Sequence, residues 1–236
     1  MRIAQLKGKG GDVKLKAKGF LFDLDGTLAD SLAVVERCWC KFGERIGKSP
    51  EEIINFIHGK PALTSLRHFL PEASDEEIMG YFRWLEKMES EDTEGVIALP
   101  GAIALLSRLN EIGAPWAIVT SGTVPIAHGR QQAAGLPEPK HWITFEKVSK
   151  GKPDPEPFLL GAQALSLPTK SCIAFEDAQA GIHSALTAGC QVVAVHAPEG
   201  MPRRDEIQVI VSSLAQISVT GPDNNGDYEL FVSNLT

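Results

Sequence analysis

The stretch FLFDLDGTLADS, Phe20 to Ser31, indicates both the fold of this chain and its chemistry. Its apolar start is typical of a buried strand, and the strand leads directly into Asp23 and Asp25. Residues i and i+2 of a strand point to one face, about 6.6 Å apart, so both carboxylates can flank one reacting group. The Gly-Thr pair that follows allows a tight turn with exposed N–H groups, which suits an anion. One capping aspartate would explain a single acid here, but not the pair.

Other strands are expected further along the chain. Four runs are apolar without alternation, which is typical of parallel strands buried on both faces: 20–24, 116–120, 172–175 and 192–196. Helical segments are expected between them, at 103–112, 156–165 and 178–188. This order predicts an α/β fold whose core is a doubly wound (Rossmann-like) parallel sheet. Ligands of such sheets bind at the carboxyl ends of the strands.

The segment 32–96 has no clear strand and is predicted to be an inserted α-helical cap domain, with helices at 32–46, 50–58, 63–69 and 75–91. The core is then expected to comprise residues 18–31 and 97–220. Residues 1–17 are basic and lack the apolar region of a signal peptide, so we expect a flexible N-terminal extension rather than a phosphate-attracting tail. Residues 221–236 are expected to form either a hairpin or a frayed tail.

Composition excludes several classes of protein. The chain has 236 residues, a formal net charge of −7 and a pI of about 5.4, which argues against nucleic acid as a partner. No apolar run approaches the roughly 18 residues of a membrane helix. The four cysteines lack the spacing of a zinc site. Free thiols without a signal peptide predict a cytoplasmic protein.

Three further polar groups follow predicted strands or lie in the loop beside one. Thr120 ends a strand and is followed by Ser121 and Gly122, which offers a hydroxyl and free amides to an anion. Such turns are common, so this signal is weak alone. Lys152 lies in the loop KGKPDPEP, where two prolines can hold it against a phosphate oxygen. A solvated loop lysine is the alternative.

An acidic pair, Glu176 and Asp177, follows the strand at 172–175 and suggests a site for a hard cation such as Mg²⁺. Helix capping by Asp177 is the alternative. All these groups fall at one edge of the predicted sheet, so one crevice can collect them. A carboxylate that attacks a phosphate dianion needs this charge neutralisation.

The pattern resembles the haloacid dehalogenase superfamily of aspartyl-phosphate hydrolases, in the order DxDGTL, a strand-end Thr, a lysine in GKPDPEPF and an acidic pair in FEDAQAG. Within it, the chain is similar to the β-phosphoglucomutase-like subgroup and to bacterial sugar phosphatases. The resemblance covers about 20–219. Dehalogenases of this superfamily lack a carboxylate at the position of Asp25, so its presence favours phosphoryl transfer.

The resemblance implies a role for each motif residue. Asp23 would be the nucleophile and a Mg²⁺ ligand. Asp25 would protonate the leaving oxygen and then deprotonate water, while its backbone carbonyl binds the metal. Thr120 and Lys152 would hold the phosphoryl oxygens, with the amides of Ser121 and Gly122 as further donors. The metal would also be bound by Asp177, with Glu176 beside it.

The cap is expected to select the substrate. The sequence His58-Gly59-Lys60 stands at the position of the family's substrate-facing loop, and Arg67 and His68 could reach the same cavity. Solvated side chains are the alternative for these residues. Ser31 is expected to cap the helix that leads into the cap.

The resemblance implies a Mg²⁺-dependent phosphatase of small sugar (hexose or hexitol) phosphates that acts through an aspartyl phosphate. Small capped members of the family are often monomers, and we expect a monomer with a small-molecule substrate. The alternatives are a sugar phosphomutase on the same core, a catalytically idle binding module, and a receiver-like switch with a phosphorylatable aspartate.

Overall fold

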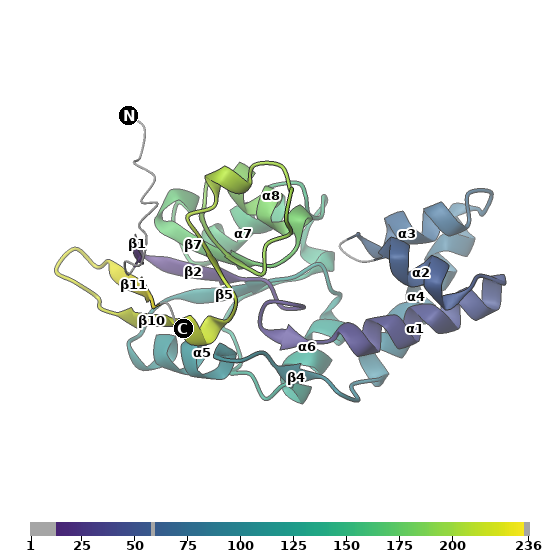
Figure 1. Cartoon of the computed structure of the whole chain (residues 1–236), viewed down its shortest axis with the longest axis horizontal. Coiled ribbons are helices and arrows are strands. Elements are labelled where there is room, and N and C mark those ends of the chain that lie inside the picture. Colours follow the sequence, from purple (N-terminus) through teal and green to yellow (C-terminus); the bar gives the residue numbers. More distant parts are fainter. Residues whose placement is uncertain (1–12, 58–59, 234–236) are drawn as a thin grey trace.

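A six-stranded parallel sheet forms the centre of the protein, as seen in a computed structural model that describes residues 13–57 and 60–233 (Figure 1). The strand order is β6-β5-β2-β7-β8-β9, with every neighbouring pair parallel. The strands are β6 (Trp142–Ile143), β5 (Trp116–Val119), β2 (Gly19–Phe22), β7 (Cys172–Glu176), β8 (Gln191–Val195) and β9 (Val209–Val211). The four predicted strands are confirmed. The two outer strands, β6 and β9, were not predicted, because strands of two or three residues are too short to show a hydrophobic pattern.

Helices cover both faces of this sheet, so the doubly wound α/β fold is confirmed. On one face Phe20 and Phe22 pack with residues of α5 (Ala102–Glu111) and α6 (Val124–Ala133). On the other face Leu21 packs with residues of α7 (Glu156–Ala164) and α8 (Gln179–Ala188). Within the first layer the rings of Phe22 and Phe175 stack at 4.4 Å between centroids. The central strands are buried on both sides, as their unbroken apolar sequences require.

Four helices lie together beside the sheet, at the right of Figure 1. They are α1 (Leu32–Ile46), α2 (Pro50–Ile57), α3 (Ala62–Phe69) and α4 (Asp75–Glu91). Two short strands, β3 (Ala29–Asp30) and β4 (Ile97–Ala98), pair with each other. They are the two segments through which the chain enters the helical group and returns from it. The division into core and cap at residues 31/32 and 96/97 stays a proposal.

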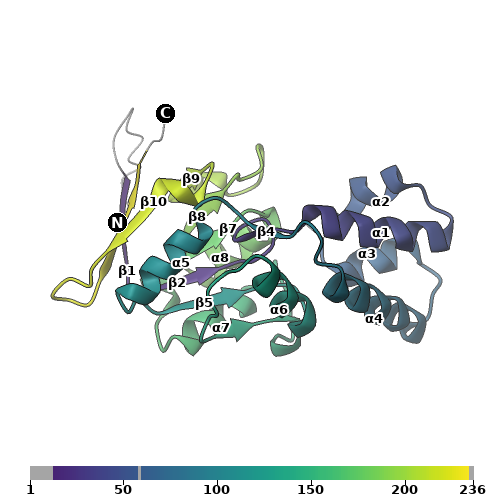
Figure 2. The same cartoon turned by 90° about the horizontal axis from the view of Figure 1, so that it is seen from below.

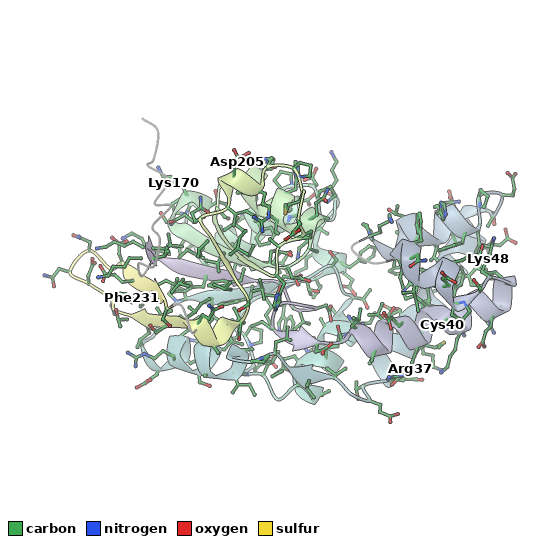
Figure 3. The ribbon with its side chains drawn as sticks, in the orientation of Figure 1. Arg37, Cys40, Lys48, Lys170, Asp205 and Phe231 are labelled. Carbon is green, nitrogen blue, oxygen red and sulfur yellow. The ribbon has the colours of Figure 1, made fainter. Side chains whose placement is uncertain are left out.

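The helical group has contacts among its own helices and contacts with the sheet layer. Arg37 of α1, which Figure 3 labels, donates to both carboxylate oxygens of Asp92, at 3.0 and 2.7 Å. This pair joins the first cap helix to the end of the last. Helix α4 lies against α6 of the sheet layer (Figure 2). Phe82 of α4 also contacts the ring of Phe145, which begins the short helix η1 (Phe145–Lys147), with 5.1 Å between centroids.

The two ends of the described chain meet in a second, antiparallel sheet of order β1-β11-β10. Its strands are β1 (Val13–Ala17), β10 (Ile217–Thr220) and β11 (Tyr228–Val232). The prediction of a flexible extension is therefore wrong for residues 13–17. Their alternation VKLKA fits a half-buried strand, but the partner strand lies more than 200 residues away in sequence. Residues 1–12 lie outside the described residues.

The hairpin, one of the two alternatives for the C-terminal segment, is what the structure contains. It begins earlier than expected, because β10 falls in residues assigned to the core. Lys16 of β1 pairs with Asp223 at 3.0 Å and with Glu229 at 3.3 Å, so basic β1 lies beside acidic residues of this hairpin. Among residues 13–57 and 60–233, no helix has the length and apolarity needed to cross a lipid bilayer.

Candidate active site

A buried lysine joins the two acidic motifs of the sequence. Lys152 Nζ lies 2.6 Å from Asp23 Oδ1 and 2.5 Å from Glu176 Oε1, and it donates to the carbonyl oxygen of Val119 at 2.8 Å. Asp23 follows β2, Val119 ends β5 and Glu176 ends β7, which are neighbouring strands of the sheet. Asp23 and Lys152, which are 129 positions apart in sequence, thus meet because the carboxyl ends of parallel strands share one edge.

The loop that carries Lys152 is held by the helix that follows it. The carboxylate of Glu156, at the start of α7, accepts from the backbone N–H of Ser149 and of Lys150, each at 2.8 Å. Ser184 of α8 donates to the carbonyl oxygen of Asp154 at 2.5 Å. Lys152 is therefore directed inward and is 6% exposed, which excludes the solvated alternative.

Both carboxylate oxygens of Glu176 accept hydrogen bonds. Oε1 accepts from Lys152, and Oε2 accepts from the turn that leads into α8. Its Oε2 accepts from the N–H groups of Asp177 and Ala178, at 3.2 and 3.3 Å. Burial alone would lower the pKa of Lys152, but the charges of Asp23 and Glu176 raise it above its usual value. The lysine is consequently a fixed cation beside Asp23.

Glycine at position 181 is required for this arrangement. A Cβ there would lie 1.8 Å from Glu176 Oε1, whereas at Gly80 of α4 a Cβ would meet nothing within 4 Å. We expect Gly181→Ala to lower the free energy of unfolding by about 1–3 kcal/mol, because the helix must move away from Glu176. Gly80→Ala, the matched helical control, should raise it by about 0.5–1 kcal/mol. Urea unfolding of both variants measures the difference, and equal effects would contradict the close approach.

Three carboxylates form a group that can hold a metal ion. One oxygen each of Asp23, Glu176 and Asp177 lies within 4.8 Å of the others. Thr27 Oγ1 donates to Asp177 Oδ1 at 3.2 Å. Gly26, at φ +85°, lets the backbone approach, since a Cβ would lie 2.2 Å from Asp177 Oδ2. Such hard oxygen ligands suit Mg²⁺.

The electrostatics of the group also favour a cation. Burial, and then the charge of Glu176, raises the pKa of Asp23 from 3.8 to about 7. Burial, and then the charge of Asp23, raises that of Asp177 to about 7. Without a metal these carboxylates repel one another, and a divalent cation relieves that repulsion. The side chain of Asp25 is not a member of the group; its predicted metal contact, through the backbone carbonyl, stays a prediction.

Metal-dependent stability should therefore vary with pH. Because both pKa values are raised, the folded metal-free protein holds protons between pH 4 and 7 that the unfolded chain has released, so its stability falls as the pH rises through this range. We expect Mg²⁺ at 100 times its Kd to raise Tm by roughly 5–10 °C at pH 8. The shift should shrink toward zero at pH 5.5, where protons compete for the ligands.

Thermal melts with and without Mg²⁺ at the two pH values test this. Asp177→Asn should lose most of the shift at pH 8. An equal shift at both pH values would show that Mg²⁺ binds elsewhere.

The predicted phosphate-binding turn is only partly free. Thr120, 4% exposed, accepts the N–H of Gly122 on Oγ1 at 3.0 Å, so its hydroxyl hydrogen remains to be donated. The Gly122 amide is thus engaged within the turn and is not the free donor that was expected. Ser121 is exposed. The turn continues from β5, beside β2, on the same edge as Asp23.

Asp25 is bound by two residues, Ser31 and Arg130, that were not predicted to contact it. Ser31 Oγ donates to Asp25 Oδ1 at 2.6 Å, and Arg130 Nη1 lies 2.7 Å from the same oxygen. Ser31 does stand at the N-terminus of α1, but its side chain makes no capping bond there, so that prediction is wrong. Arg130 also pairs with Glu89 Oε2 at 2.5 Å. No motif marks Arg130, which lies in a helix that the sequence analysis did not predict.

Of the cap residues predicted to contact the substrate, the structure describes Lys60, Arg67 and His68. His58 and Gly59 lie outside the described residues. Lys60 is exposed; its Nζ donates to the carbonyl oxygen of Phe56 at 2.6 Å and lies 3.9 Å from the centre of that ring. The Arg67 side chain pairs with Asp75. His68 stacks on Phe56 with 3.7 Å between ring centroids. Their contacts are therefore within the cap.

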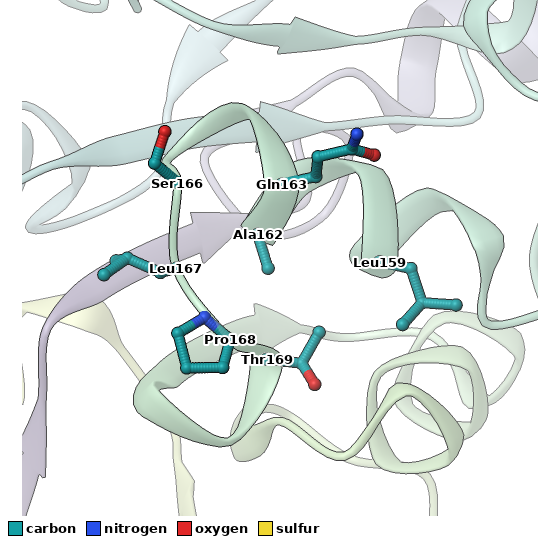
Figure 4. Close-up of a pocket in the computed structure, with 7 residues that line it drawn as sticks. All are labelled: Leu159, Ala162, Gln163, Ser166, Leu167, Pro168 and Thr169. Atoms are coloured by element: carbon teal, nitrogen blue, oxygen red, sulfur yellow. The ribbon is translucent and has the colours of Figure 1, made fainter.

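A surface groove between α7 and η2 (Thr169–Ser171) shares no residue with this site (Figure 4). Its lining is mostly apolar and includes Leu159, which is 47% exposed. The groove contains no charged side chain, so it offers nothing to the chemistry of the acidic site.

Comparison with known proteins identifies the family. The family model of haloacid dehalogenase-like hydrolases matches residues 17–189. The chain belongs to this family. Hexitol phosphatase A of Escherichia coli (strain K12) is 54% identical over 213 residues, which cover 90% of this chain and 98% of that protein. Glycerol-1-phosphate phosphohydrolase 2 of Saccharomyces cerevisiae is 34% identical and covers 78% of this chain and 76% of its own length.

Solved structures agree. A family IA, variant 3 hydrolase of Entamoeba histolytica superposes with a TM-score of 0.76 at 26% identity, covering 85% of this chain and 95% of its own. The predicted family and the assignment to hydrolases are therefore confirmed, and the relatives named above are phosphatases. The Asp23–Lys152–Glu176 contact and the neighbouring Asp177 lie within the residues that the family model matches.

Proposed function

We propose that the protein is a Mg²⁺-dependent phosphatase of small sugar phosphates that acts through a phosphorylated aspartate. The observation that carries this proposal is the buried contact of Lys152 with Asp23, beside a group of carboxylates suited to a cation. A fixed cation and a metal site next to one carboxylate supply the charge neutralisation that attack on a phosphate dianion needs. A binding module or a switch would not require all of them together.

In the first step a carboxylate oxygen of Asp23 attacks phosphorus, and the bond from phosphorus to the sugar oxygen breaks. Asp25 gives its proton to that leaving oxygen. Lys152 favours the ionised form of Asp23 and attracts a phosphoryl oxygen through its nearby positive charge, while the Thr120 hydroxyl donates to another. These groups are already in position before the reaction begins. Their charges can therefore stabilise the transition state without any rearrangement of the site.

In the second step a water molecule attacks the phosphorus of the aspartyl phosphate. Asp25, now ionised, takes the proton from this water, and the bond between phosphorus and Asp23 breaks. Free phosphate leaves and both carboxylates regain their starting states. Asp23 and Asp177, with Glu176 beside them, would hold Mg²⁺, which supplies charge neutralisation for the phosphoryl group when bound.

The substrate class rests on similarity. The match to Hexitol phosphatase A covers 98% of that protein, so hexose and hexitol phosphates are our first candidates. The loop that contains residues 58–60 connects α2 and α3 of the cap, and we propose that it contacts the sugar. We further propose a cytoplasmic monomer with no nucleic-acid partner.

A panel of hexose, hexitol, pentose and glycerol phosphates, assayed with Mg²⁺ for released phosphate, tests this function. We expect hexitol and hexose phosphates to have the highest kcat/KM, and EDTA to abolish turnover. Nuclear magnetic resonance of the same mixtures tests the alternative of a mutase. An isomerised sugar phosphate with a bisphosphate intermediate, in place of free phosphate, would overturn the proposal.

A further inference from the structure

We propose that Arg130 is a positioning residue for proton transfer: it fixes Oδ1 of Asp25, so that Oδ2 is the oxygen that carries the proton. The inference rests on the proposed function, in which Asp25 is first the acid and then the base. Arg130 belongs to α6 and lies in none of the four sequence motifs by which the chain resembles its family. Its contact with Asp25 is a feature that only the structure reveals.

Two donors meet on one oxygen of Asp25. Arg130 Nη1 lies 2.7 Å from Oδ1 and Ser31 Oγ lies 2.6 Å from it, whereas Oδ2 takes part in neither contact. Arg130 always carries its protons, and so acts only as a donor. An oxygen that accepts from a guanidinium and a hydroxyl is a poor position for a further proton. When Asp25 is protonated, the hydrogen therefore resides on Oδ2.

This arrangement suits a residue that must both give and take a proton. A neutral carboxyl group keeps Oδ1 as an acceptor, so both anchoring bonds survive when Oδ2 is protonated. The side chain need not rotate between the two steps of the reaction. Only the hydrogen on Oδ2 is exchanged, first with the leaving sugar oxygen and then with the attacking water.

Arg130 is itself held by the cap. Its Nη2 pairs with Glu89 of α4, and the two side chains are 4% and 8% exposed. A buried arginine between two carboxylates has a defined position. If its side chain moved away, buried charges would be left without a partner. Helix α4, which Figure 2 shows beside α6, is a cap helix. The cap therefore contributes to the position of Asp25 through this pair.

A purely structural role is the competing explanation, since the same pair could merely join α4 to α6. The two explanations differ in their dependence on Asp25. If Arg130 acts through Asp25, removing Asp25 also removes the effect of Arg130 on the rate. If it only supports the fold, the two losses are independent and multiply.

The test is a double-mutant cycle with Arg130→Met and Asp25→Asn, assayed on a hexitol phosphate with Mg²⁺. We expect Arg130→Met to lower kcat by about 10- to 100-fold with KM changed by less than about threefold, because binding groups remain. Arg130→Lys should recover part of the loss, since one donor returns. The double variant should be no slower than Asp25→Asn alone.

A second readout uses an aryl phosphate, whose leaving group needs no proton. With Arg130→Met we expect a burst of about one equivalent of phenol followed by slow turnover, because only water activation is then impaired. A misfolded variant would instead show a burst reduced in proportion to its inactive fraction.

Arg108→Lys is the control. Glu89→Gln loosens the hold on Arg130, so it should lower Tm and should lower kcat by less than Arg130→Met does. Arg108 lies on α5, pairs with Glu111 and donates to the carbonyl oxygen of Val219, so its replacement should leave kcat unchanged. If Arg130→Met does not fold, Arg130→Lys takes its place in the cycle.

Two results would overturn the inference: an unchanged kcat in the Arg130 variants, or a double variant slower than Asp25→Asn by the full factor of the Arg130 change. Wild-type turnover and its loss in Asp23→Asn report separately on the proposed function. The inference can thus fail while the phosphatase assignment stands.

Discussion

Asp23→Asn is expected to reduce phosphate release by about 10⁴-fold or more, to the background rate, because an amide cannot form the phosphorylated intermediate. The fold should persist. Asparagine has the same shape, and Lys152 keeps its contact with Glu176 at 2.5 Å. The measurement is steady-state phosphate release with Mg²⁺, together with thermal melts of the metal-free protein.

Asp30→Asn is the matched control for this change. Asp30 lies on the same segment but is exposed, and its carboxylate accepts only the local N–H of Leu32, at 3.3 Å, among the bonds of the described residues. It should retain wild-type turnover. Comparable turnover in Asp23→Asn and Asp30→Asn would exclude covalent catalysis by Asp23.

Lys152→Met should have the largest combined effect on stability and activity. The change leaves two buried carboxylates, Asp23 and Glu176, without their shared cation, which typically costs about 3–5 kcal/mol of unfolding free energy. Turnover should fall below detection, since neither the nucleophile nor the phosphoryl group is then neutralised. Urea unfolding without metal and phosphate release with Mg²⁺ measure the two effects.

The neighbouring Lys150 supplies the control, because it lies in the same loop with its side chain exposed. Lys150→Ala should change stability by less than about 0.5 kcal/mol and leave turnover intact. The loss of stability in Lys152→Met should also be smaller at pH 5 than at pH 8, because carboxylates with raised pKa values are neutral at the lower pH. Equal stability of the two variants at pH 8 would contradict the ion-pair assignment.

The strands that carry the site could be predicted because their signal is local. Each central strand is a continuous apolar run, and each run ends in residues that a structural strand would not need, such as Asp23, Thr120 or Glu176. The rule that parallel strands share one carboxyl edge then brings these residues together. Strand β1 was not predicted, because its partner, β11, is more than 200 residues away in sequence. Without knowledge of that pairing, the sequence of β1 looks the same as that of a polar extension.

The individual contacts within the site could not be predicted in the same way. Ser31 was assigned to a helix cap, yet its hydroxyl binds Asp25. Glu176 was placed beside a metal, yet one of its oxygens holds Lys152. A side chain chooses among partners by distances of a few tenths of an ångström, and these depend on how the helices pack.

The sequence by itself determined the family of this protein, its parallel sheet and the residues that bring charge to one edge of that sheet. These features depend on residue type and on spacing along the chain. Tertiary structure alone decided which charges pair: Lys152 with both acids, and Arg130 with Asp25 and Glu89. The physical reason is burial, because a charge removed from water must find a partner, and packing determines which partner is within reach.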